Sequence, residues 1–558
     1  MKKVKRTLAM VLAVCMLVTL LTGCDEDPND EDKLSVVLTG TFATMDPAMA
    51  ETVAERTVVL HLFDNLLRWD GTQAVPAAAQ SWQRSDNEDG TVTYSFHLRA
   101  DGQWSDGKAV TAADFVYAWQ RLVSPDTASP NAAILSMVAG YEDAHAGDSE
   151  ALQVAAEGNS TFTVTLSEPC SYFINSVCTA AATMPVRQDA VESVTALPAE
   201  DGDDAEDDGE DESAMVLPDW SVSRTFFVGN GPFYRTGDWA DTSRLTLQKQ
   251  ESHHDARRVT HDKLELVLQN REQAQRSAGR VDVVIGAAAE EGGYADGGAP
   301  TVGLLLINQM ATNMERDGLR HALEEAIDRN ALQQELGVGY VPAAGLVPAG
   351  IRTGSGDDFR AANGALIDND PDTYTQRTGD AVALLREAGY VNSDTLSALG
   401  TVTLLYDNTT HMASIARLLQ QQWRDTLGIN VTLQGKGTEE YQQSLLNGEF
   451  TMALTELTAL CSDAAAYLEP WRSGDSRNYA LLYSNAYDIL MRVAAASSSD
   501  EARDAYLKDA EQLLLDGHNV IPLFGEEQPY QFREGVTGAV KDGLGAWYFG
   551  SVQNMIQQ

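Results

Sequence analysis

Positive charge, cysteine and long apolar runs are all scarce in this chain of 558 residues. Lysine and arginine number 39 against 82 aspartate and glutamate residues, which gives a formal net charge of −43. A surface this acidic repels a phosphate backbone, which argues against nucleic acid as a partner. Beyond residue 21 no apolar run approaches the length of a membrane-spanning helix, so we expect the body of the chain to lie outside the bilayer.

The first 24 residues have the parts of an export signal. Four basic residues within Met1–Arg6 precede an uncharged apolar stretch, Leu8–Leu21. At about 14 residues this stretch is too short to span a bilayer and is typical of a signal-peptide core. It ends in Leu21-Thr22-Gly23-Cys24, which resembles the lipobox of bacterial lipoproteins.

The lipobox resemblance implies cleavage before Cys24 and attachment of lipid to its thiol. We therefore interpret residues 1–23 as a lipoprotein signal peptide and the acidic residues 24–33 as a tether. The mature chain is expected on the outer face of the cell membrane, in a Gram-positive bacterium. An ordinary signal peptide followed by an incidental cysteine is the alternative.

Three cysteines remain after Cys15 and Cys24 are set aside. Cys170 and Cys178 are close enough in sequence to pair in an oxidising compartment, which would leave Cys461 free. Three free, buried thiols are the alternative, and the sequence does not decide between them.

An acidic run, Glu200–Glu212, accounts for part of the net charge. Such a run repels itself, so we expect a disordered surface loop near residues 197–217. A cation-attracting or calcium-binding patch is the alternative.

A chain of this length is too long for one core and predicts two or three domains. Alternating or apolar runs predict strands over 34–38, 92–98, 161–166, 245–247, 264–268, 402–406 and 429–433. Helical spacing and capping residues predict helices over 51–67, 111–122, 319–332, 380–388, 411–427, 439–446 and 501–515. Because strands alternate with helices in the later half, we expect an α/β domain with a mixed or parallel sheet there.

Short motifs in a fixed order resemble extracellular solute-binding proteins of family 5. Each motif is weak alone, but they run from about residue 34 to about residue 525 behind a lipobox. The matching segments are Ala79-Gln80-Ser81-Trp82, Tyr94–Arg99, Trp104–Lys108, Val110–Trp119, Thr127-Ala128-Ser129-Pro130, Gly229–Phe233, Ala326-Ile327-Asp328-Arg329, Val341–Pro348, Leu384–Tyr390 and Trp423–Val431.

The resemblance implies an α/β fold of the periplasmic-binding-protein type II kind, with two lobes, a hinge and an extra domain (the three-domain cluster C arrangement). It implies a split domain I (34–68, 220–302 and 526–558), a domain II (69–219) and a domain III (303–525). The ligand would lie between domains I and III, which close around it.

The resemblance also implies a function. The chain would capture small peptides and deliver them to an ABC permease, as a monomer, without catalysis and without a cofactor. Peptide backbone amides would pair with strand edges, and a buried carboxylate would hold the terminal ammonium through a charge-assisted hydrogen bond.

Six residues are predicted to line the ligand. In the family an aspartate shortly after a cysteine holds the amine, and Cys461-Ser462-Asp463 fits that position; capping of the following helix is the alternative role of Asp463. Oligopeptide-binding members carry an arginine and a tryptophan shortly before that cysteine, but here the segment is Glu456–Leu460, which leaves ligand length and peptide specificity open. Leu460, next to Cys461, is also predicted to line the ligand. The other predicted positions are Ile134, Phe42 and Phe524, of which the two phenylalanines fit the core equally well.

The sequence gives little support to a catalytic, phosphate-binding or metal-binding site. No Gly-x-Ser-x-Gly elbow, metalloprotease His-Glu-x-x-His motif or phosphate-binding loop is present. His253-His254-Asp255 falls where the family has a loop, so we expect solvated surface rather than a metal site. Asp368, Asp370 and Asp372 imitate a calcium loop, but Thr373 replaces the required glycine.

Alternative functions are a binder of a metal chelate, a sugar or a signalling peptide, and a ligand-free adhesive surface lipoprotein. An extracytoplasmic hydrolase would need a catalytic constellation that the sequence does not supply.

Overall fold

The computed structural model describes residues 33–193, 219–287, 300–353, 357–497 and 499–554. The predicted signal peptide, Cys24, the tether and the acidic run Glu200–Glu212 lie outside these residues. Within the described part of the chain, no helix is both long enough and apolar enough to cross a membrane.

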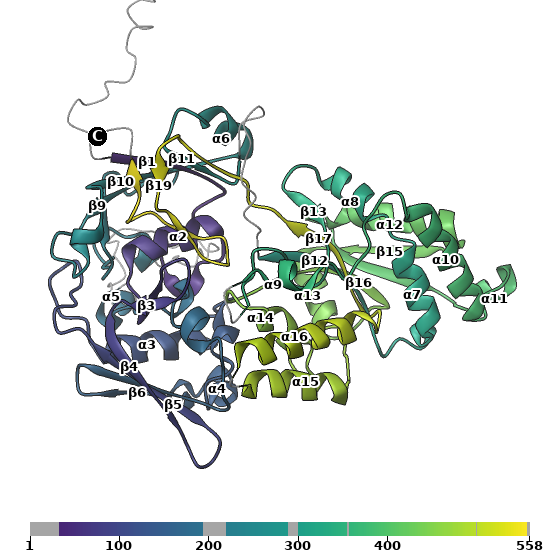
Figure 1. The fold of residues 1–558 in the computed structure, drawn as a ribbon, viewed down its shortest axis with the longest axis horizontal. Helices are drawn as coiled ribbons and strands as arrows, with labels where there is room; N and C mark the ends of the chain where they lie inside the picture. Colours follow the sequence, from purple (N-terminus) through teal and green to yellow (C-terminus); the bar gives the residue numbers. More distant parts are fainter. Residues whose placement is uncertain (1–32, 194–218, 288–299, 354–356, 498, 555–558) are drawn as a thin grey trace, which may run out of the picture.

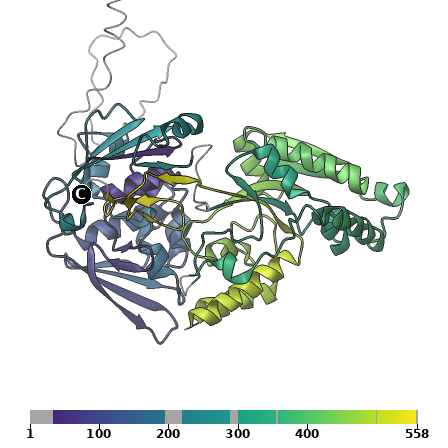
Figure 2. The same cartoon turned by 45° about the horizontal axis from the view of Figure 1, so that its top comes forward.

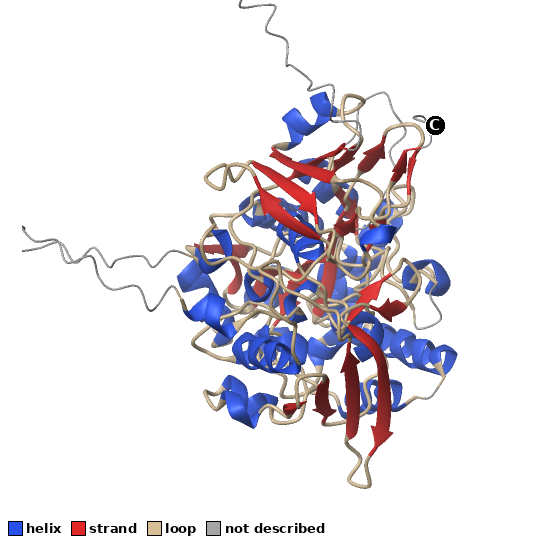
Figure 3. Ribbon diagram, turned by 90° about the vertical axis from the view of Figure 1, so that its left-hand side faces the viewer, coloured by secondary structure: helices blue, strands red, loops and turns tan. Residues whose placement is uncertain are grey.

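Two lobes lie side by side (Figures 1 and 2). The first lobe contains a six-stranded sheet in the order β18-β11-β1-β10-β9-β8 and a four-stranded antiparallel sheet in the order β4-β5-β7-β6. Figure 3 shows β4 and β5 as a long hairpin at the lower edge of the molecule. The strands are β1 (Lys33–Thr39), β8 (Phe233–Thr236), β9 (Arg244–Lys249), β10 (Lys263–Gln269), β11 (Val283–Ile285), β18 (Tyr530–Phe532), β4 (Ala79–Asp86), β5 (Val92–Leu98), β6 (Val154–Glu157) and β7 (Thr161–Leu166).

The second lobe is built on one mixed sheet in the order β13-β17-β12-β16-β14-β15. β14 runs parallel to both β15 and β16, and the other pairs are antiparallel. This confirms the predicted α/β region with a mixed sheet. The strands are β12 (Thr301–Ile307), β13 (Tyr340–Pro342), β14 (Val402–Asp407), β15 (Val431–Lys436), β16 (Met452–Thr458) and β17 (Val520–Glu526).

Helices cover both faces of this second sheet. Because successive strand residues point to opposite faces, Leu304 and Leu306 of β12 join one core cluster while Leu305 and Ile307 join another. One face carries α7 (Asp317–Glu325), α8 (Arg329–Leu336), α10 (Tyr374–Glu387) and α12 (Met412–Leu427). The other carries α13 (Thr438–Leu446), α14 (Ala465–Leu468), α15 (Asn485–Ala496) and α16 (Asp500–Leu515).

The remaining elements are short or belong to the first lobe. Their helices are α2 (Val53–Leu62), α3 (Ala112–Val123), α4 (Tyr141–His145), α5 (Gln188–Glu192), α6 (Arg271–Ser277), α9 (Phe359–Asn363) and α11 (Ser393–Ser397). The short strands are β2 (Leu67–Trp69), β3 (Ala74–Pro76), β19 (Val536–Thr537), β20 (Val540–Lys541), β21 (Trp547–Tyr548) and β22 (Gln553–Asn554). The division into three domains stays a prediction. The first strand of the second lobe, β12, begins at Thr301, two residues before the predicted start of domain III at 303.

Most predicted elements are confirmed, and three helices differ in extent, of which α10 begins at Tyr374, six residues before the predicted start at 380. The helix predicted over 51–67 ends at Leu62, because the chain turns there and Leu67 begins β2. The helix predicted over 319–332 is two helices, because the carboxylate of Asp328 accepts the N–H of Ala331 and starts α8. α12 ends at Leu427, directly before Gly428, as predicted.

Two of the family-like motifs support the fold of the first lobe. Gly231 touches the backbone at the end of α2, where a Cβ would lie 2.5 Å from the carbonyl carbon of Leu62. Beside it, Asn230 exchanges two hydrogen bonds of 2.9 Å with the backbone of Asp64. In the second motif, Asp114 accepts the N–H of Thr111 at 2.7 Å and so fixes the start of α3.

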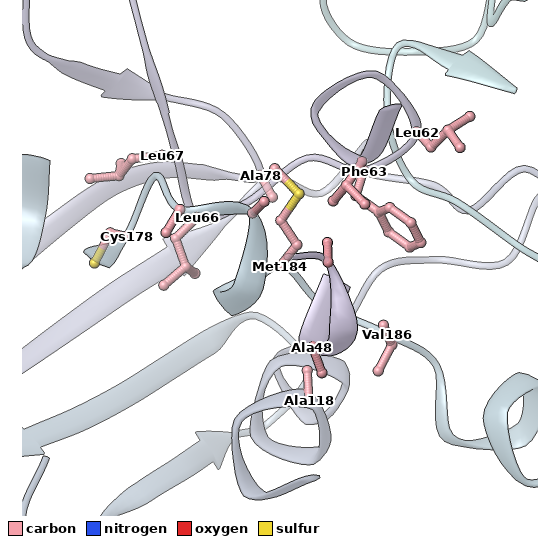
Figure 4. Packing of buried hydrophobic residues seen from close by; sticks show 14 of the residues in the cluster. Ala48, Leu62, Phe63, Leu66, Leu67, Ala78, Ala118, Cys178, Met184 and Val186 are labelled. Atoms are coloured by element: carbon pink, nitrogen blue, oxygen red, sulfur yellow. The ribbon is translucent and has the colours of Figure 1, made fainter. Parts of the chain in front are cut away.

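All three described cysteines are free and buried. Figure 4 shows Cys178 beside Leu66 and Leu67 in the core of the first lobe. Burial raises the pKa of the Cys170 thiol to about 12. The structure therefore favours three free thiols over a bridge between Cys170 and Cys178.

His61, in α2, ties the first lobe to the last residues of the chain. Its Nδ1–H donates to the carbonyl of Thr57 at 2.7 Å, and its Nε2 accepts the N–H of Phe549 at 2.9 Å. The side chain is fully buried, and burial lowers the pKa of His61 to about 3. The imidazole is therefore held neutral, because protonation at Nε2 would break the bond to Phe549.

We expect the free energy of unfolding to fall as the pH is lowered from about 6.5 toward 4, because the unfolded chain binds a proton at His61 that the folded chain does not. This group alone should cost on the order of 3 kcal/mol at pH 4. Urea unfolding between about pH 7 and pH 4 should show a shallower pH dependence in His61→Gln than in the wild type. His97→Gln, at a half-buried position, is the control, and equal slopes in His61→Gln and the wild type would contradict this account.

Candidate ligand-binding site

Two cavities open where the lobes meet, and both are lined by residues of each lobe. One has a volume of about 280 Å³ and a strongly polar lining. The other has a volume of about 350 Å³ and mixes apolar and charged side chains. Tyr172, in the first lobe, lines both cavities and so stands between them.

Asp463 lines the polar cavity from the second lobe, in the loop between β16 and α14. Its side chain is buried, and Oδ1 accepts the N–H of Ala465 at 2.8 Å. The same oxygen accepts a hydrogen bond from Nη2 of Arg503. Among the described residues no donor reaches the other oxygen, Oδ2. The N-cap of α14 is Ala464 rather than Asp463, and the bond from Ala465 uses only one of the two Asp463 oxygens.

Arg503 compensates the negative charge of the buried Asp463 carboxylate. It projects from α16, and its side chain is only 3 % exposed. Burial by itself would lower the pKa of Arg503, but the adjacent Asp463 carboxylate raises it above its ordinary value. A buried charge without such a partner would be strongly destabilising. Tyr172 lies over the guanidinium, with 5.8 Å between the ring centroid and Cζ.

Three other predicted residues line the second cavity together. Ile134 comes from the first lobe, and Leu460 and Cys461 come from the second. Arg477 shares this cavity, and its Nε and Nη2 hold the Asp475 carboxylate at 2.9 and 2.7 Å. Its Nη1 has no partner among the described residues. The segment before Cys461 lacks a cationic side chain, but Arg477 supplies one to the same cavity.

Phe42 and Phe524 lie in the core rather than at these cavities. Phe524 has no exposed surface, and its ring packs edge-on against Tyr340 and His411 at centroid distances of 5.6 and 5.7 Å. Phe42 is buried in the main cluster of the first lobe. Of the two roles proposed for them, the structure shows core packing.

Sequence reasoning missed Tyr172, Arg503 and Arg477. Arg503 lies 40 residues after Asp463, and this separation gives no periodic or motif signal. Tyr172 follows Cys170 closely, but a single aromatic in an irregular segment does not reveal that two cavities meet at its ring.

His253 and His254 do not form solvated surface, contrary to our expectation. Their side chains are 3 % and 7 % exposed, and each Nε2 lies within hydrogen-bond distance of Oδ2 of Asp64, at 3.1 and 2.7 Å. Arg68 contacts the other oxygen of Asp64 at 2.6 Å. Burial alone would raise the pKa of Asp64, but Arg68 and the two imidazoles hold it well below its ordinary value.

Asp64, His253 and His254 are metal-ligating types that lie close together, but their hydrogen bonds oppose a metal. Nδ1 of His253 accepts the N–H of Asp255 at 3.1 Å. The ring proton therefore lies on Nε2, where it is donated to Asp64. A metal bound at Nε2 of His253 would need the lone pair of that nitrogen, so the ring proton would move to Nδ1. There it would face the N–H of Asp255, which is also a donor. The geometry fits a buried hydrogen-bonded ion-pair network.

Two α/β lobes with ligand-sized cavities between them define a two-lobe solute-binding protein. Residues 73–479 match the bacterial extracellular solute-binding proteins, family 5 Middle. Since this match covers most of the chain, the protein belongs to the family 5 solute-binding proteins.

Relatives and solved structures agree with this assignment. The dipeptide-binding protein DppE of Bacillus subtilis (strain 168) is 27 % identical over 84 % of this chain and 82 % of its own length. The periplasmic oligopeptide-binding protein OppA of Escherichia coli (strain K12) is 27 % identical over 86 % and 84 %. The structure of OppA from Burkholderia pseudomallei is 26 % identical, covers 91 % of this chain and 96 % of its own, and has a TM-score of 0.65. The two-lobe α/β fold implied by the sequence is therefore confirmed.

The Asp64 network makes a prediction about stability and metal. We expect Asp64→Asn to lower the free energy of unfolding by at most about 3–5 kcal/mol, because Arg68 loses its nearest carboxylate, at 2.6 Å, and keeps only Asp255, at 3.1 Å. The exposed pair of Asp86 and Arg84 offers a control, and Asp86→Asn should cost less than about 1 kcal/mol. Zinc should not raise the unfolding temperature of the wild type. A zinc-dependent rise that disappears in His254→Ala would show instead that these residues bind a metal.

Proposed function

We propose that this protein captures short peptides in the cleft between its lobes and delivers them to an ABC importer. The observation that carries the proposal is the buried carboxylate of Asp463 at the polar cavity, with Oδ2 free of protein donors. Peptides share a terminal ammonium whatever their sequence, so one such oxygen serves many ligands. The names of the relatives, which bind dipeptides and oligopeptides, support the same ligand class.

Arg503 prepares Asp463 for this role. Its guanidinium is the positive partner of the buried carboxylate, and the N–H of Ala465 donates to the same oxygen. The remaining oxygen is then fixed in direction before the ligand arrives. A preorganised, partly desolvated acceptor gives a stronger charge-assisted hydrogen bond than a mobile one in water.

The second cavity suits the next part of the ligand. Ile134, Leu460 and Cys461 supply an apolar wall, and Arg477 supplies a cation for a carboxylate. Together the two cavities are of the size of common small-molecule sites. We propose that the ligand's amine lies at Asp463 and that its chain runs past Tyr172 into this second cavity.

The cellular setting is part of the proposal. The family consists of extracellular solute-binding proteins, and the resemblance of Leu21–Cys24 to a lipobox supports a lipid on Cys24 at the outer face of the membrane. We propose that the protein works there as a monomer, as a binding protein rather than an enzyme.

The ligand is tested by mass spectrometry of the full chain carrying Cys24→Ser. We expect short peptides to co-purify and to appear on denaturation. Asp463→Asn should reduce their affinity about 10- to 100-fold, since a hydrogen bond to a charged group is lost. Calorimetry with a peptide identified in the released pool provides the affinity.

Stability and binding must be separated, because Asp463→Asn also removes the close partner of Arg503 and leaves it only Asp504, at 3.7 Å. The double variant Asp463→Asn with Arg503→Met removes both charges and should regain stability without regaining affinity. Asp500→Asn changes an exposed carboxylate of the same cavity and is the matched control. A wild-type protein that carries no peptide and is stabilised by none would overturn the proposed ligand class.

The lipid anchor at Cys24 is tested separately from the ligand. In the native host, the protein should be recovered with membranes and its first residue should be a lipid-bearing Cys24. Cys24→Ser should release it to the soluble fraction. Equal membrane recovery of both forms would contradict the lipid anchor and leave the ligand class untouched.

A further inference from the structure

The segment that carries Asp463 belongs to the second lobe but is held in place by contacts with the first lobe. We call Leu460–Asp463 the anchor loop. Ser462, in its middle, accepts a hydrogen bond of 3.0 Å at its carbonyl oxygen from Oγ of Ser176 in the first lobe. Cys461 belongs to the buried cluster of the first lobe, although it follows a strand of the second. The anchor loop is therefore seated across the boundary between the lobes.

Gly543 forms the other side of this seat. A Cβ on Gly543 would lie 1.6 Å from Oγ of Ser462, 2.5 Å from its Cβ and 3.4 Å from its Cα. Rotating the Ser462 hydroxyl would relieve the first contact but not the second, because the Cβ is fixed by the backbone. Any side chain at position 543 must therefore push Ser462 away, and Asp463 is the next residue.

Gly543 cannot easily yield instead, because its turn is braced. We call Asp542–Ala546 the C-terminal turn. Oδ1 of Asp542 accepts the N–H groups of Leu544 and Ala546 at 2.9 and 2.8 Å. Nη2 of Arg56 donates to the carbonyl of Leu544 at 3.3 Å. These bonds fix the turn to the first lobe.

The contact between the two segments is reciprocal. Leu544, in the C-terminal turn, is 5 % exposed and belongs to a core cluster of the second lobe. Cys461, in the anchor loop, belongs to the cluster of the first. Each lobe thus inserts one apolar side chain into the other, which fixes the two segments relative to each other.

From this geometry we propose that Gly543 and Ser176 are positioning residues for the amine anchor. They set the place of Ser462, and through it the direction of the free Asp463 oxygen, from the wall of the same polar cavity. The inference rests on the proposed function, and it adds that the anchor is completed by residues far away in the sequence.

The test is a compensating pair of substitutions in the full chain carrying Cys24→Ser. The probe is a short peptide from the pool released by the wild type, synthesised with a free and with an acetylated N-terminus. Gly543→Ala should weaken binding of the free peptide about 10- to 100-fold, because the charge-assisted bond is misaligned. Ser462→Gly removes the atoms that clash, so Gly543→Ala with Ser462→Gly should bind within about twofold of Ser462→Gly alone.

Three further measurements make the outcome decisive. The acetylated peptide should bind weakly and equally to the wild type and to Gly543→Ala, since it lacks the ammonium. Ser176→Ala, a milder change, should weaken only the free peptide and serves if Gly543→Ala does not fold. Gly379→Ala in α10, where a Cβ would meet nothing within 4 Å, should leave binding unchanged.

Two results overturn the inference while leaving the proposed function intact. One is wild-type affinity in Gly543→Ala. The other is a double variant that binds as weakly as Gly543→Ala alone, which would show that the effect does not pass through Ser462. Absence of peptide binding by the wild type itself would instead overturn the proposed function.

Discussion

The ion pair of Asp463 and Arg503 is the interaction on which the cleft depends. A carboxylate this deeply buried needs a positive partner, and an unpaired one would either take up a proton or destabilise the second lobe. Arg503 satisfies the charge through Oδ1 and leaves Oδ2 at the cavity. The pair therefore combines two features that usually conflict, a stable buried acid and a carboxylate oxygen that no donor among the described residues reaches.

The lobes meet where this pair lies, so the structure of the interface and the structure of the site cannot be separated. Tyr172 from the first lobe lies over Arg503 and divides the two cavities. The anchor loop and the C-terminal turn exchange apolar side chains across the same boundary. Hinge motion of the lobes would change the cavity walls, while the braced turn keeps the anchor loop in register.

The family-like motifs of the first lobe serve mainly the fold. Gly231 and Asn230 fix the end of α2, and Asp114 starts α3. These positions are recognisable in sequence because each has one tight steric or hydrogen-bonding demand.

The sequence by itself determined many of the elements and the class of protein, but it did not predict β12, β16 and β17 of the second sheet. Apolar alternation predicted β5 and β7, glycine predicted the end of α12, and ordered motifs predicted the two-lobe fold, because these signals are local. It also found Asp463, Cys461, Leu460 and Ile134, which line the cavities. Only the tertiary structure could bring Arg503, Tyr172, Ser176 and Gly543 to the anchor, since their meeting depends on lobe packing across long separations. For the same reason Phe524 proved to be core, and His253 and His254 proved to be buried beside a carboxylate that lies 189 and 190 positions earlier in the chain.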